Sequence, residues 1–173
     1  MRIAAHDLAG TFHSRKGQSR PQPRVGFREV TRLTTALADA ALTAALASAV
    51  RVVYGDDPLD AQLSVIAMGK CGAGELNYIS DVDVLFVGSE ATPRVTRLAS
   101  EFNRIGSACF FEVDANLRPE GKSGALVRTL DSHIAYYKRW AETWEFQAQL
   151  KARPQTGYMP LGKDYVDNLS LIH

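Results

Sequence analysis

Residues 69–83 combine a glycine-rich turn with the start of an acidic strand: Gly69-Lys70-Cys71-Gly72-Ala73-Gly74-Glu75-Leu76-Asn77-Tyr78-Ile79-Ser80-Asp81-Val82-Asp83. A short apolar run at 63–68 precedes the turn and ends at its first glycine. A second run at 81–87 follows and stops at Gly88-Ser89. Short apolar runs bounded by turn residues are typical of strands, so this region predicts two strands joined by the turn.

Asp81 and Asp83 stand two residues apart at the start of the second predicted strand. Side chains at i and i+2 of a strand share one face, about 6.5–7 Å apart at the backbone. Leu85 and Val87 continue that face, and burying two unpaired carboxylates beside them would be costly. Mg²⁺, a hard cation that prefers oxygen ligands, is the obvious partner. The alternative is that Asp81 only caps the strand and Asp83 lies on the surface.

A third acidic residue, Asp114, lies within a further strand expected at 110–117. Glu112 shares its face of that strand, and apolar residues form the other face. A carboxylate from an adjacent strand would complete the cluster with Asp81 and Asp83. Three carboxylates and two Mg²⁺ ions would balance nucleotide phosphates, as in two-metal phosphoryl transfer.

Candidate phosphate-binding groups lie on both sides of the carboxylates along the chain. Glycine lets the backbone approach an anion closely, and lysine or arginine adds a positive charge. Neither a Walker phosphate loop nor a GxGxxG motif occurs, so the glycine spacing alone is weak evidence. A solvated turn is the alternative for the loop after the third acid. The candidates are Gly69, Lys70 and Ser80 before the acidic strand, and Arg118 and Lys122 in that loop.

Helices are predicted where apolar residues recur every three or four positions. Three stretches show this period: 28–51, 94–108 and 130–152. A shorter helix is expected at 2–12, and the polar, basic, proline-containing run 14–24 is expected to be a loop.

The order of these elements is α-α-β-β-α-β-α, which indicates an α+β fold with a small mixed sheet flanked by helices. We divide the chain into three parts. An N-terminal helical segment (1–55) contains the basic loop, the core follows (56–130), and a helical segment (131–173) ends the chain.

The composition limits the class of protein. The chain has 173 residues, of which 46% are hydrophobic and 23% charged, and its net charge is +1. A near-zero charge argues against a general nucleic-acid-binding surface. No apolar run is expected to reach the roughly 18 residues that span a bilayer. Cys71 and Cys109 lie far apart and outside any metal-binding motif, so cytoplasmic thiols are the default. From the charge, the apolar runs and the cysteines together, we expect a cytoplasmic protein with no nucleic-acid or membrane partner.

Four segments carry a specific combination of motifs. They are 69–83, Val113-Asp114-Ala115-Asn116-Leu117-Arg118-Pro119-Glu120-Gly121, Leu126-Val127-Arg128-Thr129 and Trp144-Glu145-Phe146-Gln147-Ala148. Together they resemble the glutamine synthetase adenylyltransferase/adenylyl-removing enzyme family, over about residues 28–169. The resemblance implies a DNA polymerase beta-type nucleotidyltransferase fold and metal binding by Asp81, Asp83 and Asp114. It also implies that Gly69 and Lys70 occupy the place of the Gly-Ser turn of that superfamily.

The resemblance also implies an activity and partners. Family enzymes carry two such domains: the amino-terminal one removes AMP from glutamine synthetase by phosphorolysis and releases ADP, and the carboxy-terminal one attaches AMP from ATP. Asn77 and the context Ile79-Ser80 favour the removing copy, because the other copy tends to have glycine in place of Asn77. The implied partners are glutamine synthetase, ATP or ADP, inorganic phosphate and, in the full-length enzyme, a PII-type nitrogen signal protein.

The chain also departs from the family. It is far shorter than the family enzyme, and after Ala152-Arg153-Pro154 the family usually continues with Gly-Asp, whereas here Gly157 is followed by Tyr158-Met159-Pro160. The chain stops at His173, within an expected helix, so we expect a fragment or a truncated product. Two alternatives to AMP removal stay open: ATP-dependent adenylylation, and a remnant that binds nucleotide or partner without turnover.

Overall fold

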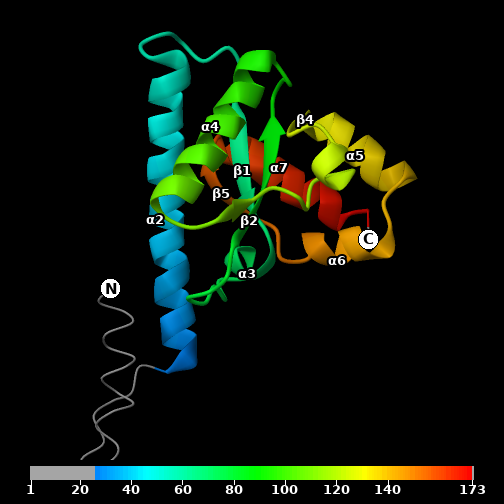
Figure 1. Ribbon diagram of the computed structural model, residues 1–173. Coiled ribbons are helices and arrows are strands. Elements are labelled where there is room, and N and C mark those ends of the chain that lie inside the picture. Colours follow the sequence, from blue (N-terminus) through cyan, green and yellow to red (C-terminus); the bar gives the residue numbers. More distant parts are fainter. Residues whose placement is uncertain (1–25, 173) are drawn as a thin grey trace, which may run out of the picture.

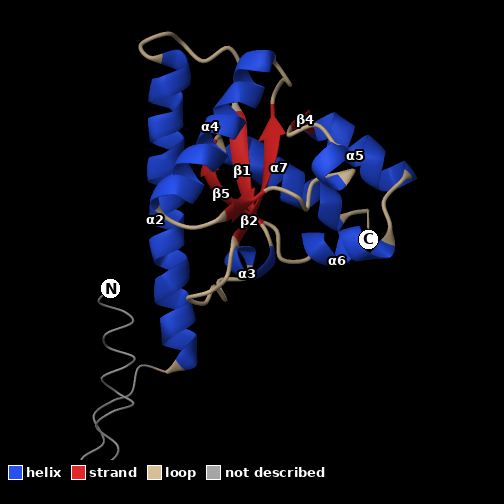
Figure 2. Cartoon of the chain, viewed as in Figure 1, coloured by secondary structure: helices blue, strands red, loops and turns tan. Residues whose placement is uncertain are grey.

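The computed structural model describes residues 26–172. The helix expected at 2–12 and the basic loop expected at 14–24 lie outside these described residues. Within them, a small sheet lies between helices, as Figures 1 and 2 show. The expectation of an α+β fold with a small mixed sheet flanked by helices is confirmed.

The helices and strands follow one another in a mixed order along the chain. They are α2 (Phe27–Tyr54), β1 (Leu63–Ala67), α3 (Gly69–Gly72), β2 (Val82–Gly88), α4 (Pro93–Cys109), β3 (Val113–Asp114), the 3-10 turn η2 (Gly121–Ser123), β4 (Val127–Thr129), α5 (Leu130–Arg139), α6 (Thr143–Gln149), β5 (Arg153–Gly157) and α7 (Met159–Ser170).

The sheet is built around β1 and β2: all of β1 pairs antiparallel with residues 84–88 of β2. On the outer side of β1, β5 also pairs antiparallel, so the strand order is β3-β2-β1-β5. Both β3 and β4 pair with β2 in parallel, at different points along its other side. The turn 69–81 therefore lies at the end of the sheet where β1 ends and β2 begins.

The strand predicted at 110–117 is wrong in its extent, because only the two residues of β3 pair with β2. Pairing resumes at β4, after the segment 115–126 has left the edge of the sheet. Arg118 gives the physical reason: its guanidinium donates to three backbone carbonyl oxygens of this same segment and closes it into a loop.

Side chains of β2 alternate between two hydrophobic cores, one on each face of the sheet. Val84 and Phe86 face α2 and α4, where the Phe86 ring meets Phe102 edge-on at a centroid distance of 5.5 Å. Leu85 and Val87 face α5 and α7. The sheet is thus the middle of three layers (Figure 1). By this alternation, Asp83 lies on the same face as Leu85.

The single helix predicted at 130–152 is wrong, because the chain forms two helices, α5 and α6. A reciprocal cap starts the second one: the Glu142 side chain accepts from the Glu145 backbone amide, and the Glu145 carboxylate accepts from the Glu142 amide. Such a cap satisfies amides at a new helix start. The sequence pattern does not predict the strand β5 at 153–157.

Helix α2 is long and apolar enough to cross a membrane, judged by length and composition alone. This corrects the expectation that no stretch reaches that length. A single helix of this kind is weak evidence for a membrane, since core helices of soluble domains pass the same test. Here a stripe that includes Ala38, Leu42 and Ala45 is buried in the core shared with α4 and the sheet.

Candidate metal and nucleotide site

Three carboxylates come together at the end of the sheet where β2 begins. Asp83 of β2 lies beside Asp114 of β3 in the parallel register, and Asp81 comes directly before β2. The three residues offer carboxylate oxygens that all lie within 4.8 Å of one another. Asp81 is exposed, and the other two are partly buried. The convergence expected from strand alternation is therefore present.

Burial and repulsion both disfavour the ionised form of Asp83. Burial is the larger cause, followed by the negative charges of Asp81 and Asp114, and together they raise the pKa of Asp83 from 3.8 to about 6. The Lys70 ammonium acts in the opposite direction but does not cancel them. A cation placed among the carboxylates would relieve this repulsion.

Gly69 allows the turn to approach the carboxylates closely. Its φ of +52° lies in the left-handed region that favours glycine. A Cβ atom at this position would lie 2.5 Å from Asp83 Oδ2. On the preceding residue, the Met68 amide donates to the backbone carbonyl of Asp83 at 2.9 Å. The turn therefore contacts Asp83 at both its backbone and its side chain.

Lys70 and Ser80 meet across the turn. Lys70 Nζ donates to Ser80 Oγ at 3.2 Å, and Ser80 Oγ donates to Asn77 Oδ1 at 2.7 Å. The same Asn77 oxygen accepts from the Ile79 amide at 3.2 Å. The bond from the Ile79 amide to the Asn77 side chain is of a kind that fixes a turn locally, and this turn comes directly before Asp81. The structure thus brings Lys70 and Ser80 together beside the acidic cluster.

The loop after Asp114 differs from the expected phosphate-binding arrangement. The Asn116 amide donates to Asp114 Oδ1 at 2.8 Å, which holds that carboxylate. The Arg118 guanidinium donates to backbone carbonyls of the loop at 2.7, 2.9 and 3.0 Å, so its donors serve the loop. Burial lowers the pKa of Arg118, and the charge of Asp114 opposes this. Lys122 lies on the surface of the loop, and its carbonyl accepts one of the Arg118 bonds.

The sequence does not predict the residues of α2 and β5 that hold the turn in place. The Leu76 amide donates to Thr35 Oγ1 at 3.1 Å, and Arg153 donates to the carbonyls of Cys71 and Gly72. Thr35 and Arg153 come from α2 and β5, far from the turn along the chain. Because these contacts are long-range, no spacing in the sequence signals them.

The fold and the site together define the chain as an α+β domain with three converging carboxylates beside a glycine turn. The matching family model then identifies the family. It is described as glutamate-ammonia ligase adenylyltransferase (GlnE) and matches residues 1–166. The chain belongs to this family, and the family recognised from the motifs is confirmed.

Curated relatives carry the name bifunctional glutamine synthetase adenylyltransferase/adenylyl-removing enzyme. The protein of Corynebacterium efficiens is 70% identical over 96% of this chain and 16% of its own length. That of Corynebacterium glutamicum is 68% identical over 98% of this chain and 16% of its own length. That of Nocardia farcinica is 60% identical over 96% of this chain and 16% of its own length. The chain thus spans 16% of the length of these relatives.

Proposed function

We propose that this chain is a magnesium-dependent nucleotidyltransferase domain of DNA polymerase beta type that transfers adenylyl groups in the control of glutamine synthetase. The observation that carries the proposal is the carboxylate cluster, whose oxygens lie within 4.8 Å of one another. Membership of an adenylyltransferase family supports the same general role.

The donor set fits a hard divalent cation. Asp81, Asp83 and Asp114 offer only carboxylate oxygens, which Mg²⁺ prefers over the nitrogen and sulfur ligands of softer metals. Burial, and then the neighbouring carboxylates, raise the pKa of Asp83, and a bound cation would remove the repulsion among the three carboxylates. These three residues would hold two Mg²⁺ ions, which, when bound, neutralise charge on the phosphates during transfer.

The turn and the neighbouring loop would hold the phosphates. Lys70 supplies a positive charge, Ser80 a hydroxyl, and Gly69 a backbone without a Cβ atom, all next to the carboxylates. Lys122 adds a charge on the surface of the loop. Arg118 contributes its charge near Asp114 while its donors hold the loop closed.

The proposed reaction is phosphorolysis of an adenylylated tyrosine of glutamine synthetase. An oxygen of inorganic phosphate attacks the phosphorus of the AMP group, and the bond from that phosphorus to the tyrosine oxygen breaks. The products are ADP and the unmodified tyrosine. Asp114, as a base, would take the proton of the attacking phosphate, and this same proton would pass to the departing tyrosine oxygen. Holding the reactants in line and balancing their charge supplies most of the catalysis.

Support for the removing direction is the resemblance of Asn77 and its context Ile79-Ser80 to the removing copy of the family. In this chain the Asn77 side-chain oxygen holds both Ser80 and the Ile79 amide. A glycine at this position could not make either bond. The relatives' name includes both adenylylating and adenylyl-removing activity, so adenylylation from ATP is the alternative. We further propose a cytoplasmic location, a PII-type signal protein as a partner of the longer enzyme, and no nucleic-acid or membrane partner.

The test is to incubate the purified chain with adenylylated glutamine synthetase, inorganic phosphate and Mg²⁺, and to measure ADP. We expect slow, phosphate-dependent release, because a domain that spans 16% of its relatives makes fewer remote contacts with the substrate. Asp83→Asn should abolish it. Asp164→Asn, which removes an exposed charge on α7, should not.

A second reaction with ATP and unmodified glutamine synthetase separates the alternatives. Incorporation of AMP there, without ADP release in the first reaction, would support the adenylylating copy. If the chain binds metal but forms neither product, the result supports a remnant without turnover.

A further inference from the structure

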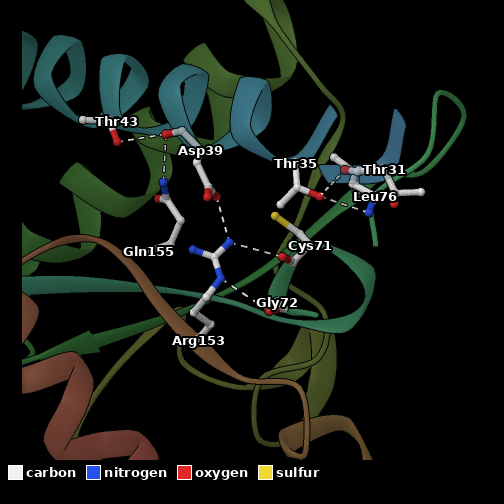
Figure 3. Close-up of polar contacts among 9 residues, drawn as sticks. All are labelled: Thr31, Thr35, Asp39, Thr43, Cys71, Gly72, Leu76, Arg153 and Gln155. Carbon is white, nitrogen blue, oxygen red and sulfur yellow. Dashed lines mark hydrogen bonds and ion pairs between the residues drawn. The ribbon is translucent and has the colours of Figure 1, made fainter. Parts of the chain in front are cut away.

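Arg153, the first residue of β5, joins three elements that are distant in the sequence (Figure 3). Its Nη2 donates to Asp39 Oδ1 on α2 at 2.9 Å and to the Cys71 carbonyl at 3.2 Å. Its Nε donates to the Gly72 carbonyl at 3.4 Å. A guanidinium suits this position, because its planar fork presents several donors in fixed directions.

The C-terminal end of α3, at Gly72, is closely packed against the segment that precedes Arg153. A Cβ atom at Gly72 would lie 2.0 Å from the Lys151 carbonyl oxygen and 2.6 Å from the Ala67 carbonyl oxygen. The Cys71 side chain is buried, and Lys151 Nζ pairs with Glu75 Oε2 at 3.0 Å. The segment that enters β5 therefore packs directly against the turn.

Helix α2 holds this turn at two places. Thr35 and Asp39 lie four residues apart and so share one face of the helix. Thr35 Oγ1 accepts from the Leu76 amide at 3.1 Å and donates to the Thr31 carbonyl at 2.8 Å. Asp39 acts through Arg153, and its own carbonyl accepts from Gln155 Nε2 at 2.8 Å. Figure 3 shows both sets of contacts on one side of α2.

The other end of α3 carries the candidate site. Helix α3 is only four residues long, so displacement of its carbonyl end at Cys71 and Gly72 also displaces Gly69 and Lys70. Gly69 has no spare room, since even a Cβ atom there would lie 2.5 Å from Asp83 Oδ2. The position of this end is therefore coupled to the Asp83 carboxylate.

We propose that Arg153 is a positioning residue for the carboxylate site: it anchors the carbonyl end of α3 to α2 and thereby holds Gly69 and Lys70 against Asp83. The effect on metal binding rests on the proposed function, whereas the anchoring of the turn does not. We expect Arg153 to add little to overall stability, because its side chain and that of Asp39 are 35% and 32% exposed and such pairs are screened by water.

The experiment compares Arg153→Gln with Arg94→Gln in the full chain. Arg94 is a matched control because it also joins a carboxylate, Asp57, to a carbonyl of α2, that of Val53. Val53 is about 20 Å further along the helix axis than Asp39, at about 1.5 Å per residue. Three quantities are measured: the melting temperature, hydrogen–deuterium exchange of residues 72–76, and Mn²⁺ binding by electron paramagnetic resonance.

Exchange reports the anchoring directly, because each backbone amide from residue 72 to residue 76 donates a hydrogen bond. In Arg153→Gln we expect exchange of 72–76 to be about tenfold faster and the Mn²⁺ concentration for half-saturation to rise about tenfold. Arg94→Gln should leave both unchanged, with a similar small change in melting temperature. Asp39→Asn is a second variant and should shift both quantities in the same direction as Arg153→Gln.

Equal exchange of 72–76 in the two arginine variants would overturn the inference, as would an unchanged Mn²⁺ affinity in Arg153→Gln. If the wild-type chain binds no Mn²⁺, the proposed function fails, and exchange alone decides the role of Arg153. Faster exchange confined to Arg153→Gln then supports anchoring, and equal exchange refutes it.

Discussion

Replacing Asp83 with asparagine is expected to stabilise the metal-free protein and to remove its response to metal. Burial, and then the charges of Asp81 and Asp114, raise the pKa of Asp83 from 3.8 to about 6 in the folded state. The folded protein therefore holds this proton more tightly than the unfolded chain, so ionisation near neutral pH destabilises the fold. Asparagine keeps nearly the same shape and carries no charge.

The pKa shift sets the size of the effect. Two pKa units correspond to about 3 kcal/mol, and solvent screening at this partly exposed site reduces that to about 1–2 kcal/mol. For a chain of this length, the melting temperature should then rise by about 2–8 °C. The stabilisation from protonated Asp83 is fully present below pH 3.8 and is lost as the pH rises through about 6. The advantage of the variant should therefore grow from about pH 4 to about pH 7.

The assay is thermal denaturation of the wild type, Asp83→Asn and Asp164→Asn, first with a chelator across this pH range and then with millimolar Mg²⁺. Asp164→Asn controls for the loss of one negative charge at an exposed position. A ligand that binds only the folded state raises the melting temperature, so Mg²⁺ should stabilise the wild type and Asp164→Asn but not Asp83→Asn. Metal-free Asp83→Asn that is no more stable than the wild type at pH 7 would refute this reasoning.

Two further substitutions test the site and the core. Gly69→Ala should weaken metal binding and lower the melting temperature more than Gly74→Ala does. Both positions have a positive φ, but only at Gly69 would the added Cβ atom lie against Asp83. Equal losses for the two variants, measured by calorimetry and Mn²⁺ titration, would contradict the close contact. Burial lowers the pKa of His133 to about 4, so its stabilising contribution is present above pH 6.5 and lost as the pH falls toward 4. His133→Phe should therefore flatten the loss of stability in acid measured by denaturant titration, and an unchanged slope would argue against a buried neutral imidazole.

Local patterns explain which parts of the fold the sequence predicts. The apolar runs that became β1 and β2 are bounded by glycine or turn residues, so their ends fall close to the predicted positions. Strand alternation likewise places Asp83 on the face of Leu85. The convergence with Asp114 needed one further assumption, that its strand lies next to β2, and the parallel register bears this out.

Contacts between distant residues explain what the sequence does not predict. The sequence of β5, Arg-Pro-Gln-Thr-Gly, has no apolar alternation, and it forms a strand because it can pair with the outer side of β1. Pro154 is tolerated there because an edge strand need not donate every backbone hydrogen bond. In the same way, the loop 115–126 depends on Arg118 reaching back to its own carbonyls, and the turn depends on Arg153 reaching Asp39.

Mn²⁺ binding tests most directly whether the three carboxylates share divalent cations. Free Mn²⁺ is counted by electron paramagnetic resonance during titration of the wild type, Asp83→Asn, Asp114→Asn and Asp164→Asn. We expect saturable binding to the wild type and to Asp164→Asn, with up to about two ions per chain, and a large loss of binding in the other two variants. Equal Mn²⁺ binding by the wild type, Asp83→Asn and Asp114→Asn would contradict the metal site.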